Sequence, residues 1–79
     1  MRVEVRLFAT LERYLPPGSR NGIAVLDLPD GSTASDVAAY LGIPSGFERV
    51  VLINGREATA ERRLAQGDIL DVYPPLAGG

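Results

Sequence analysis

One amphipathic helix is predicted in the middle of the chain, over residues Ala34 to Leu41. Its apolar residues recur three and four positions apart, and they are Ala34, Val37, Ala38 and Leu41. Thr33 is suited to the N-cap, and Asp36 three residues later completes a carboxylate variant of the capping box. Gly42 and then Pro44 end the helix. A helix with one apolar face needs a second layer of structure to cover that face, and the flanking segments must supply it.

Five of those flanking segments are predicted to be strands. The first, Arg2–Phe8, alternates strictly and places Val3, Val5 and Leu7 on one face. The others are Ile23–Leu28, Val50–Ile53, Arg56–Ala58 and Ile69–Tyr73, with the tight-turn signal Asn54-Gly55 between the third and the fourth. A helical turn is expected over Thr10–Leu15, with Thr10 as its N-cap.

The order β-β-α-β-β-β predicts an α+β fold in two layers, with one main helix covering a mixed sheet of about five strands. The first two strands are expected to form an antiparallel hairpin. The first and last strands lie side by side and parallel if the helix crosses between them. That arrangement is the β-grasp, or ubiquitin-like, roll. We assign residues 1–73 to this domain and residues 74–79 to an extended C-terminal tail.

Several residue types are absent from the chain, and their absence excludes whole classes of chemistry. There is no cysteine and no histidine, which excludes disulfides, thiolate nucleophiles, and zinc sites built from thiolate or imidazole. The usual near-neutral general base is also missing, so we expect a protein that is not an enzyme and holds no metal. The net charge is −2 with scattered arginines, which disfavours nucleic acid as a partner. No apolar run could span a membrane and no signal peptide is evident, so a cytoplasmic location is expected.

An apolar group is expected on the face of the sheet that points away from the helix. Val50–Ile53 is apolar at every position, so either Val50 and Leu52 or their neighbours must face away. Strands favour such residues wherever they point, which makes this segment a weak signal by itself. Phe8 and Tyr73 also fall on the far side, at the ends of two strands expected to be neighbours. We assign a partner-docking surface to Phe8, Tyr73, Val50 and Leu52.

The tail carries the strongest functional signal, although chain ends are often frayed and silent. It consists of Pro74, Pro75, Leu76, Ala77, Gly78 and Gly79. The two prolines after a strand force an extended path and block further sheet pairing. Gly78 and Gly79 have no side chains and can enter a channel too narrow for other residues. We expect the carboxylate of Gly79 to be delivered into another protein's active site. A carboxylate is a poor acyl donor until it is activated, for example by adenylation, so an ATP-using partner is expected.

Four segments resemble a known family, the MoaD/ThiS sulfur carriers. They are V-R-L-F-A (Val5–Ala9), I-N-G (Ile53–Gly55), G-D (Gly67, Asp68) and Y-P-P-L-A-G-G (Tyr73–Gly79). The resemblance covers nearly the whole chain. Because of the Pro-Pro pair, it is strongest to the small subunit of molybdopterin synthase.

This resemblance implies a specific role. An E1-like enzyme would use ATP to adenylate the carboxylate of Gly79, and a sulfur donor would convert it to a thiocarboxylate. The carrier would bind no cofactor itself. Its tail would then insert into a larger synthase subunit, or another sulfur acceptor, with Phe8 and Tyr73 on the docking surface. In the molybdopterin branch the acceptor is a cyclic pterin precursor that becomes a dithiolene.

Alternatives remain open within this frame. Related carriers serve thiamine synthesis, tRNA thiolation, cysteine synthesis or tungsten-cofactor pathways. A ubiquitin-like protein modifier would use the same tail to form isopeptide bonds on other proteins. All eight basic residues are arginine, so the chain cannot accept such a bond on a side chain of its own. A plain interaction module of the same fold is the third alternative.

Overall fold

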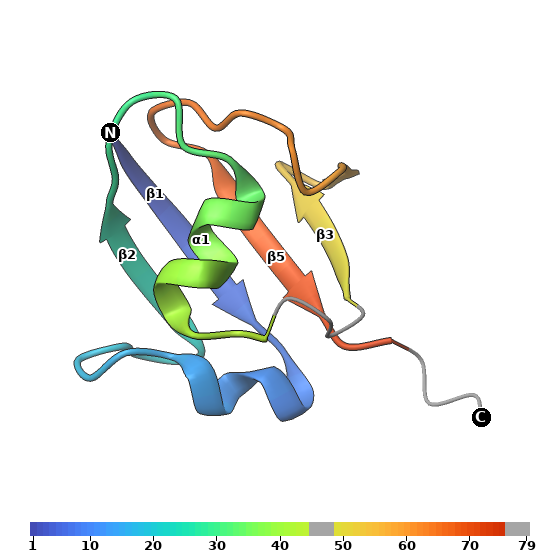
Figure 1. Cartoon of the computed structure of the whole chain (residues 1–79). Helices are drawn as coiled ribbons and strands as arrows, with labels where there is room; N and C mark the ends of the chain where they lie inside the picture. Colours follow the sequence, from blue (N-terminus) through green and yellow to red (C-terminus); the bar gives the residue numbers. More distant parts are fainter. Residues whose placement is uncertain (45–48, 76–79) are drawn as a thin grey trace.

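The computed structural model describes residues 1–44 and 49–75. Helix α1 lies across one face of a five-stranded sheet (Figure 1). The elements are β1 Arg2–Leu7, the 3-10 helix η1 Ala9–Tyr14, β2 Ile23–Asp27, α1 Ala34–Leu41, β3 Val50–Ile53, β4 Arg56–Glu57 and β5 Ile69–Tyr73. This two-layer α+β arrangement is the predicted β-grasp roll.

The sheet has the strand order β2-β1-β5-β3-β4. β1 pairs antiparallel with β2 and parallel with β5, which confirms the predicted hairpin and the predicted parallel pair. β3 pairs antiparallel with both β5 and β4. Because β1 and β5 are adjacent and parallel, the residues that end both strands lie at the same edge of the sheet (Figure 1).

The helix begins and ends where the sequence predicts. The Thr33 hydroxyl accepts a hydrogen bond from the Asp36 amide at 3.2 Å, and the Asp36 carboxylate accepts one from the Thr33 amide at 2.9 Å. This reciprocal pair satisfies two amides at the start of the helix. Gly42 ends the helix with a φ of 83°, a left-handed conformation that glycine adopts without steric cost.

The predicted N-cap at Thr10 is wrong. The 3-10 helix begins one residue earlier, at Ala9, and no side chain caps it. The Phe8 carbonyl instead accepts a hydrogen bond from the Leu11 amide at 3.0 Å, so the backbone closes this turn. β1 accordingly ends at Leu7, one residue before the predicted limit.

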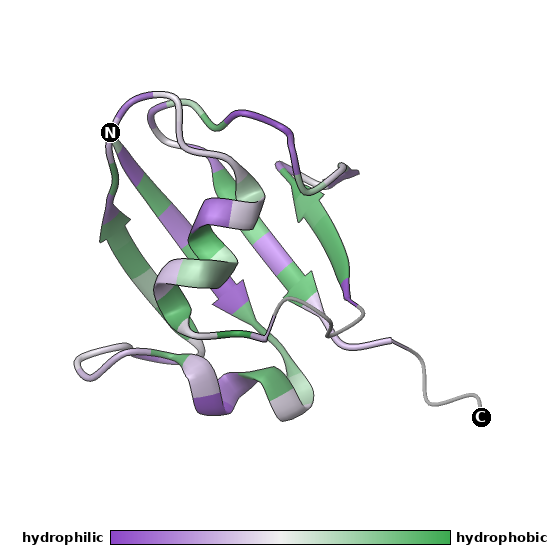
Figure 2. Ribbon diagram, in the orientation of Figure 1, coloured by the Kyte–Doolittle hydropathy of each residue, from purple (hydrophilic) through white to green (hydrophobic). Residues whose placement is uncertain are grey.

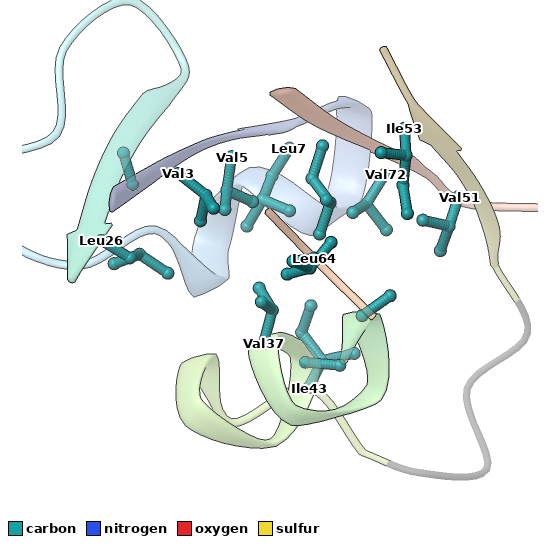
Figure 3. Packing of buried hydrophobic residues seen from close by; sticks show 14 of the residues in the cluster. Val3, Val5, Leu7, Leu26, Val37, Ile43, Val51, Ile53, Leu64 and Val72 are labelled. Atoms are coloured by element: carbon teal, nitrogen blue, oxygen red, sulfur yellow. The ribbon is translucent and has the colours of Figure 1, made fainter. Parts of the chain in front are cut away.

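The hydrophobic core lies between the sheet and the helix. Side chains of β1 and β5 point toward Val37 and Ile43, and Leu64 lies between the two layers (Figure 3). Leu64 is buried. Burying an aliphatic side chain of this size contributes about 1.5–3 kcal/mol. No helix in the described part of the chain is long and apolar enough to cross a membrane.

Candidate functional site

The face of the sheet opposite α1 is partly apolar, and β3 is the clearest case. Hydropathy alternates along β1, whereas β3 is hydrophobic over its length (Figure 2). Val51 and Ile53 are buried in the core. Val50 and Leu52 therefore occupy the opposite, outer face, with Val50 exposed and Leu52 half-buried. Of the two orientations that the sequence left open, the structure adopts the one that exposes Val50.

Phe8 and Tyr73 form a stacked aromatic pair. Their ring centroids are 4.3 Å apart and the ring planes differ by 6°. Phe8 follows the last residue of β1 and Tyr73 ends β5, so the parallel pairing of these strands brings the rings together. The Phe8 amide also donates to the Val72 carbonyl at 3.1 Å. Both side chains remain half-exposed, and such a pair contributes about 0.5–1.5 kcal/mol beyond its buried area.

Ala9 redirects the chain directly after this aromatic pair. Its φ of 53° lies in the left-handed region, which costs a residue other than glycine about 1–2 kcal/mol. Strain of this kind is concentrated at binding sites, where surrounding contacts enforce it. Here the turn sends the chain into η1 and places Ala9 and Thr10 in the lining of the same groove as Phe8.

An open groove of about 640 Å³ lies at this edge of the sheet. Its lining is mainly apolar and consists of Phe8, Ala9, Thr10, Val50, Tyr73, Pro74 and Pro75. Three of the four predicted docking residues thus share one groove. The fourth, Leu52, lies on the same face but one step away, opposite Asp71 on β5.

The tail begins in the wall of this groove, which is called the docking groove below because it contains three of the residues predicted to dock a partner. Pro74 and Pro75 line it directly. The other predicted tail residues, Leu76, Ala77, Gly78 and Gly79, lie outside the described residues.

An ion pair that the sequence reading missed lies beside the docking groove. The Arg6 Nε and Nη2 donate to the two carboxylate oxygens of Asp71 at 2.5 and 2.7 Å. The Asp71 side chain is 8% exposed and that of Arg6 is 44% exposed. The hydrogen bond to Asp71, and then its negative charge, raise the pKa of Arg6 above its usual value.

The alternation of apolar and polar residues along β1 and β5 predicts that Arg6 and Asp71 lie on the polar face of the sheet, opposite the helix. It predicts neither their pairing nor the burial of Asp71. A signal for the pair was present in the sequence. Each residue precedes an aromatic residue by two positions, Phe8 in one case and Tyr73 in the other, on strands predicted to be parallel neighbours.

The motifs I-N-G and G-D form a separate cluster toward the other end of β5. Asn54 donates from Nδ2 to Asp68 Oδ1 at 2.9 Å, and Asn54 Oδ1 accepts from the Ile69 amide at 3.0 Å. The second Asp68 oxygen accepts from the Ala65 amide at 2.8 Å. None of these residues lines the docking groove. These two motifs therefore stabilise the fold, whereas F-A and Y-P-P build the groove.

A family model described as Mut7-C ubiquitin matches residues 1–77 of the chain. No curated protein sequence gives a match.

Several solved structures resemble the chain over nearly its whole length. The Haloferax volcanii HVO 2177 protein is 30% identical with a TM-score of 0.76, over 100% of this chain and 87% of that one. The H. volcanii small archaeal modifier protein 1 is 27% identical with a TM-score of 0.74, over 95% and 98%. A complex of subunits 1 and 2 of the molybdopterin-converting factor from Helicobacter pylori 26695 contains a chain that is 20% identical with a TM-score of 0.62, over 100% of both. At that identity the likeness to the H. pylori chain is one of fold.

Proposed function

The chain belongs to the Mut7-C ubiquitin family, and we propose that it is a ubiquitin-like sulfur carrier whose sulfur is held at the carboxyl group of Gly79. The observation that carries this proposal is the position of the docking groove. The aromatic pair and the first two tail residues line the same groove. A partner that covers the groove therefore also contacts the tail where it leaves the domain.

The proposed reaction takes place on the tail, and another protein performs it. An E1-like enzyme in the cytoplasm binds ATP and the carrier, and the Gly79 carboxylate attacks the α-phosphate and releases pyrophosphate. Sulfide (HS⁻) released by a sulfur donor then attacks the acyl adenylate, displaces AMP and leaves a thiocarboxylate. The carrier contributes a stable folded domain, a docking surface and a narrow tail, and it binds no cofactor of its own.

We propose that the sulfur goes to a pterin precursor during synthesis of molybdopterin, the ligand of the molybdenum and tungsten cofactors. The sequence Y-P-P-L-A-G-G supports this branch, as does the fold shared with subunit 1 of the H. pylori molybdopterin-converting factor, which was solved with its second subunit. The corresponding partner here would be a larger synthase subunit. Carriers for thiamine, tRNA or cysteine pathways would use the same tail with a different acceptor.

The decisive experiment measures the intact mass of the 79-residue chain after incubation with the E1-like enzyme of the same genome, ATP and a sulfur donor. We expect the mass increase of one oxygen replaced by sulfur, located at Gly79 by fragmentation. A chain lacking Gly79 should gain nothing, and Phe8→Glu should gain sulfur more slowly because docking is weakened. An unchanged mass with every E1-like enzyme of the genome would refute the carrier function.

A second function, protein modification, is favoured by one specific comparison. The chain is 27% identical to a protein whose name is small archaeal modifier protein 1. Under this alternative, affinity capture from cells should recover adducts that link Gly79 to lysines of other proteins. Because the chain has no lysine, each side-chain adduct should carry a single copy. Adducts that disappear when Gly79 is deleted would support modification, and their absence in cells that express the carrier would exclude it.

A further inference from the structure

We propose that Arg6 makes the docking groove selective for a partner protein that places a carboxylate beside the apolar side chain it seats in the groove. The inference rests on the proposed function in one respect only, that the groove is a docking surface. Arg6 is a charged residue next to the groove, and docking by apolar contacts alone would give it no role. The proposal gives it a role in recognising the partner.

The Arg6–Asp71 pair lies one step from the aromatic pair along the same two strands. Arg6 is opposite Asp71 in the parallel ladder. Side chains two residues apart in a strand point to the same face, about 7 Å apart. Phe8 and Tyr73 therefore follow Arg6 and Asp71 on the outer face, and a protein surface that covers the aromatic rings also reaches the guanidinium.

Arg6 is held in place but only partly satisfied. Its Nε and one Nη2 proton bond to the nearly buried Asp71 carboxylate. A guanidinium has five N–H donors. Among the described residues the Nη1 donors of Arg6 have no protein partner. The side chain is thus pre-organised, and little further rotamer entropy is lost when a partner binds.

The physical basis of selectivity is desolvation. A partner that covers the groove removes water from Arg6 and leaves charged donors unpaired unless it supplies acceptors. A carboxylate supplies the strongest acceptor for a guanidinium, through short charge-assisted hydrogen bonds. A purely apolar partner surface would be rejected at this position, because a site built to hydrogen-bond discriminates against groups that cannot do so.

The nearest acidic side chain is Asp71, which is 8% exposed and already accepts hydrogen bonds from Arg6 through both carboxylate oxygens. The other neighbouring acidic side chains leave this approach open. Glu4 lies two residues before Arg6, on the side away from Phe8. Glu57 lies on β4, three strand spacings from Arg6 at about 14 Å, which is beyond the screening length of about 8 Å at physiological salt. The charged group that a ligand carboxylate meets beside the aromatic rings on β1 is therefore Arg6.

The test replaces the ion pair with a neutral hydrogen-bonded pair, Arg6→Gln with Asp71→Asn. The control makes the same two changes at Arg2 and Asp27, a pair on the same face at the far end of β1. That pair is 3.4 Å apart with side chains 65% and 77% exposed. Both double variants keep the net charge of the wild type. The probe is the E1-like adenylating enzyme of the same genome, and calorimetry measures the Kd at low and high salt.

We expect the variant at positions 6 and 71 to raise the Kd by about 10- to 100-fold and to lose most of the salt dependence of binding. The control should stay within about twofold of the wild type. If the double variant unfolds, Arg6→Lys serves instead. Lysine keeps a positive charge beside Asp71 but lacks the guanidinium fork, so we expect a Kd about tenfold higher than that of the wild type.

Wild-type affinity in these variants, with binding abolished by Phe8→Glu, would show that the pair only supports the strands. If Phe8→Glu also binds normally, the groove is not a docking surface and the inference falls with it. A failed sulfur transfer together with the expected change in Kd would refute the carrier function and leave the role of Arg6 standing.

Discussion

Replacing Asp68 with alanine should destabilise the fold by about 3 kcal/mol without weakening the docking groove. The Asp68 residue is 9% exposed, and its carboxylate accepts hydrogen bonds from the Asn54 side chain at 2.9 Å and from the Ala65 amide at 2.8 Å. A hydrogen bond to a charged group has a net value of about 1.5–3 kcal/mol. Because part of the carboxylate still contacts water, the lower figure applies to each bond, and the sum is about 3 kcal/mol.

The assay is urea unfolding followed by circular dichroism. For a domain of this size the free energy of unfolding falls by about 1 kcal/mol per molar urea. The midpoint for Asp68→Ala should therefore lie about 3 M below that of the wild type. Asp27→Ala is the matched control, since that carboxylate is 77% exposed and makes one 3.4 Å contact with Arg2. Its midpoint should shift by less than about 0.5 M.

Two results would refute the reasoning. A midpoint drop below about 1 M would show that these two bonds contribute little, against the stated net value of a charged hydrogen bond. A loss of partner affinity by the folded Asp68→Ala protein would show that the G-D motif belongs to the docking site. The structure places the motif outside the docking groove, so we expect the Kd to remain that of the wild type.

Three further experiments test local features. Thr33→Ala removes the acceptor for the Asp36 amide and should lower the free energy of unfolding by about 1 kcal/mol in urea titrations. An unchanged free energy of unfolding would contradict the capping box. Ala9→Gly relieves a φ of 53° and should raise thermal stability by up to about 1 kcal/mol, the left-handed cost less the extra chain entropy of glycine; a lower melting temperature would argue against strain. Phe8→Ala and Tyr73→Ala should show a coupling energy of about 1 kcal/mol in a double-mutant cycle, as a stacked pair requires, and additive effects would show that the rings do not interact in solution.

The features that could be predicted from the sequence are those determined by near neighbours in the chain. The limits of α1 followed from Thr33, Asp36 and Gly42, because a cap is formed within one turn of the helix. β3 and β5 were also predicted with the correct bounds, because hydropathy and turn residues mark them. Thr10 failed as a cap, because the Phe8 carbonyl closes the turn and the left-handed Ala9 starts it one residue earlier. Nothing in the composition of that segment indicates a left-handed alanine.

The features that could not be predicted depend on register between distant strands. Asp71 looked like an ordinary surface residue, and it is buried because β1 brings Arg6 opposite it across 65 positions of sequence. The docking groove was predicted only in part, because it also depends on how distant parts of the chain come together. Phe8 and Tyr73 were predicted to lie close together because the first and last strands were expected to be parallel neighbours. The contributions of Ala9 and Thr10 could not be predicted, because they depend on the path that the chain takes after β1. Leu52 was included because it shares a face with Val50, although Val50, two residues before it, is the residue of β3 that lines the groove.

The parallel pairing of β1 and β5 joins docking to presentation of the tail. It places Phe8 beside Tyr73, and Arg6 beside Asp71 on the same outer face. The tail leaves directly from the end of β5, through Pro74 in the wall of the groove. A substitution that weakens this pairing must therefore change the docking surface and the direction of the tail together. A substitution in the Asn54–Asp68 cluster, outside the groove, should lower stability alone. Partner affinity and resistance to urea are consequently separable in this fold, and each can be assigned to its own set of residues by measuring both on the same variants.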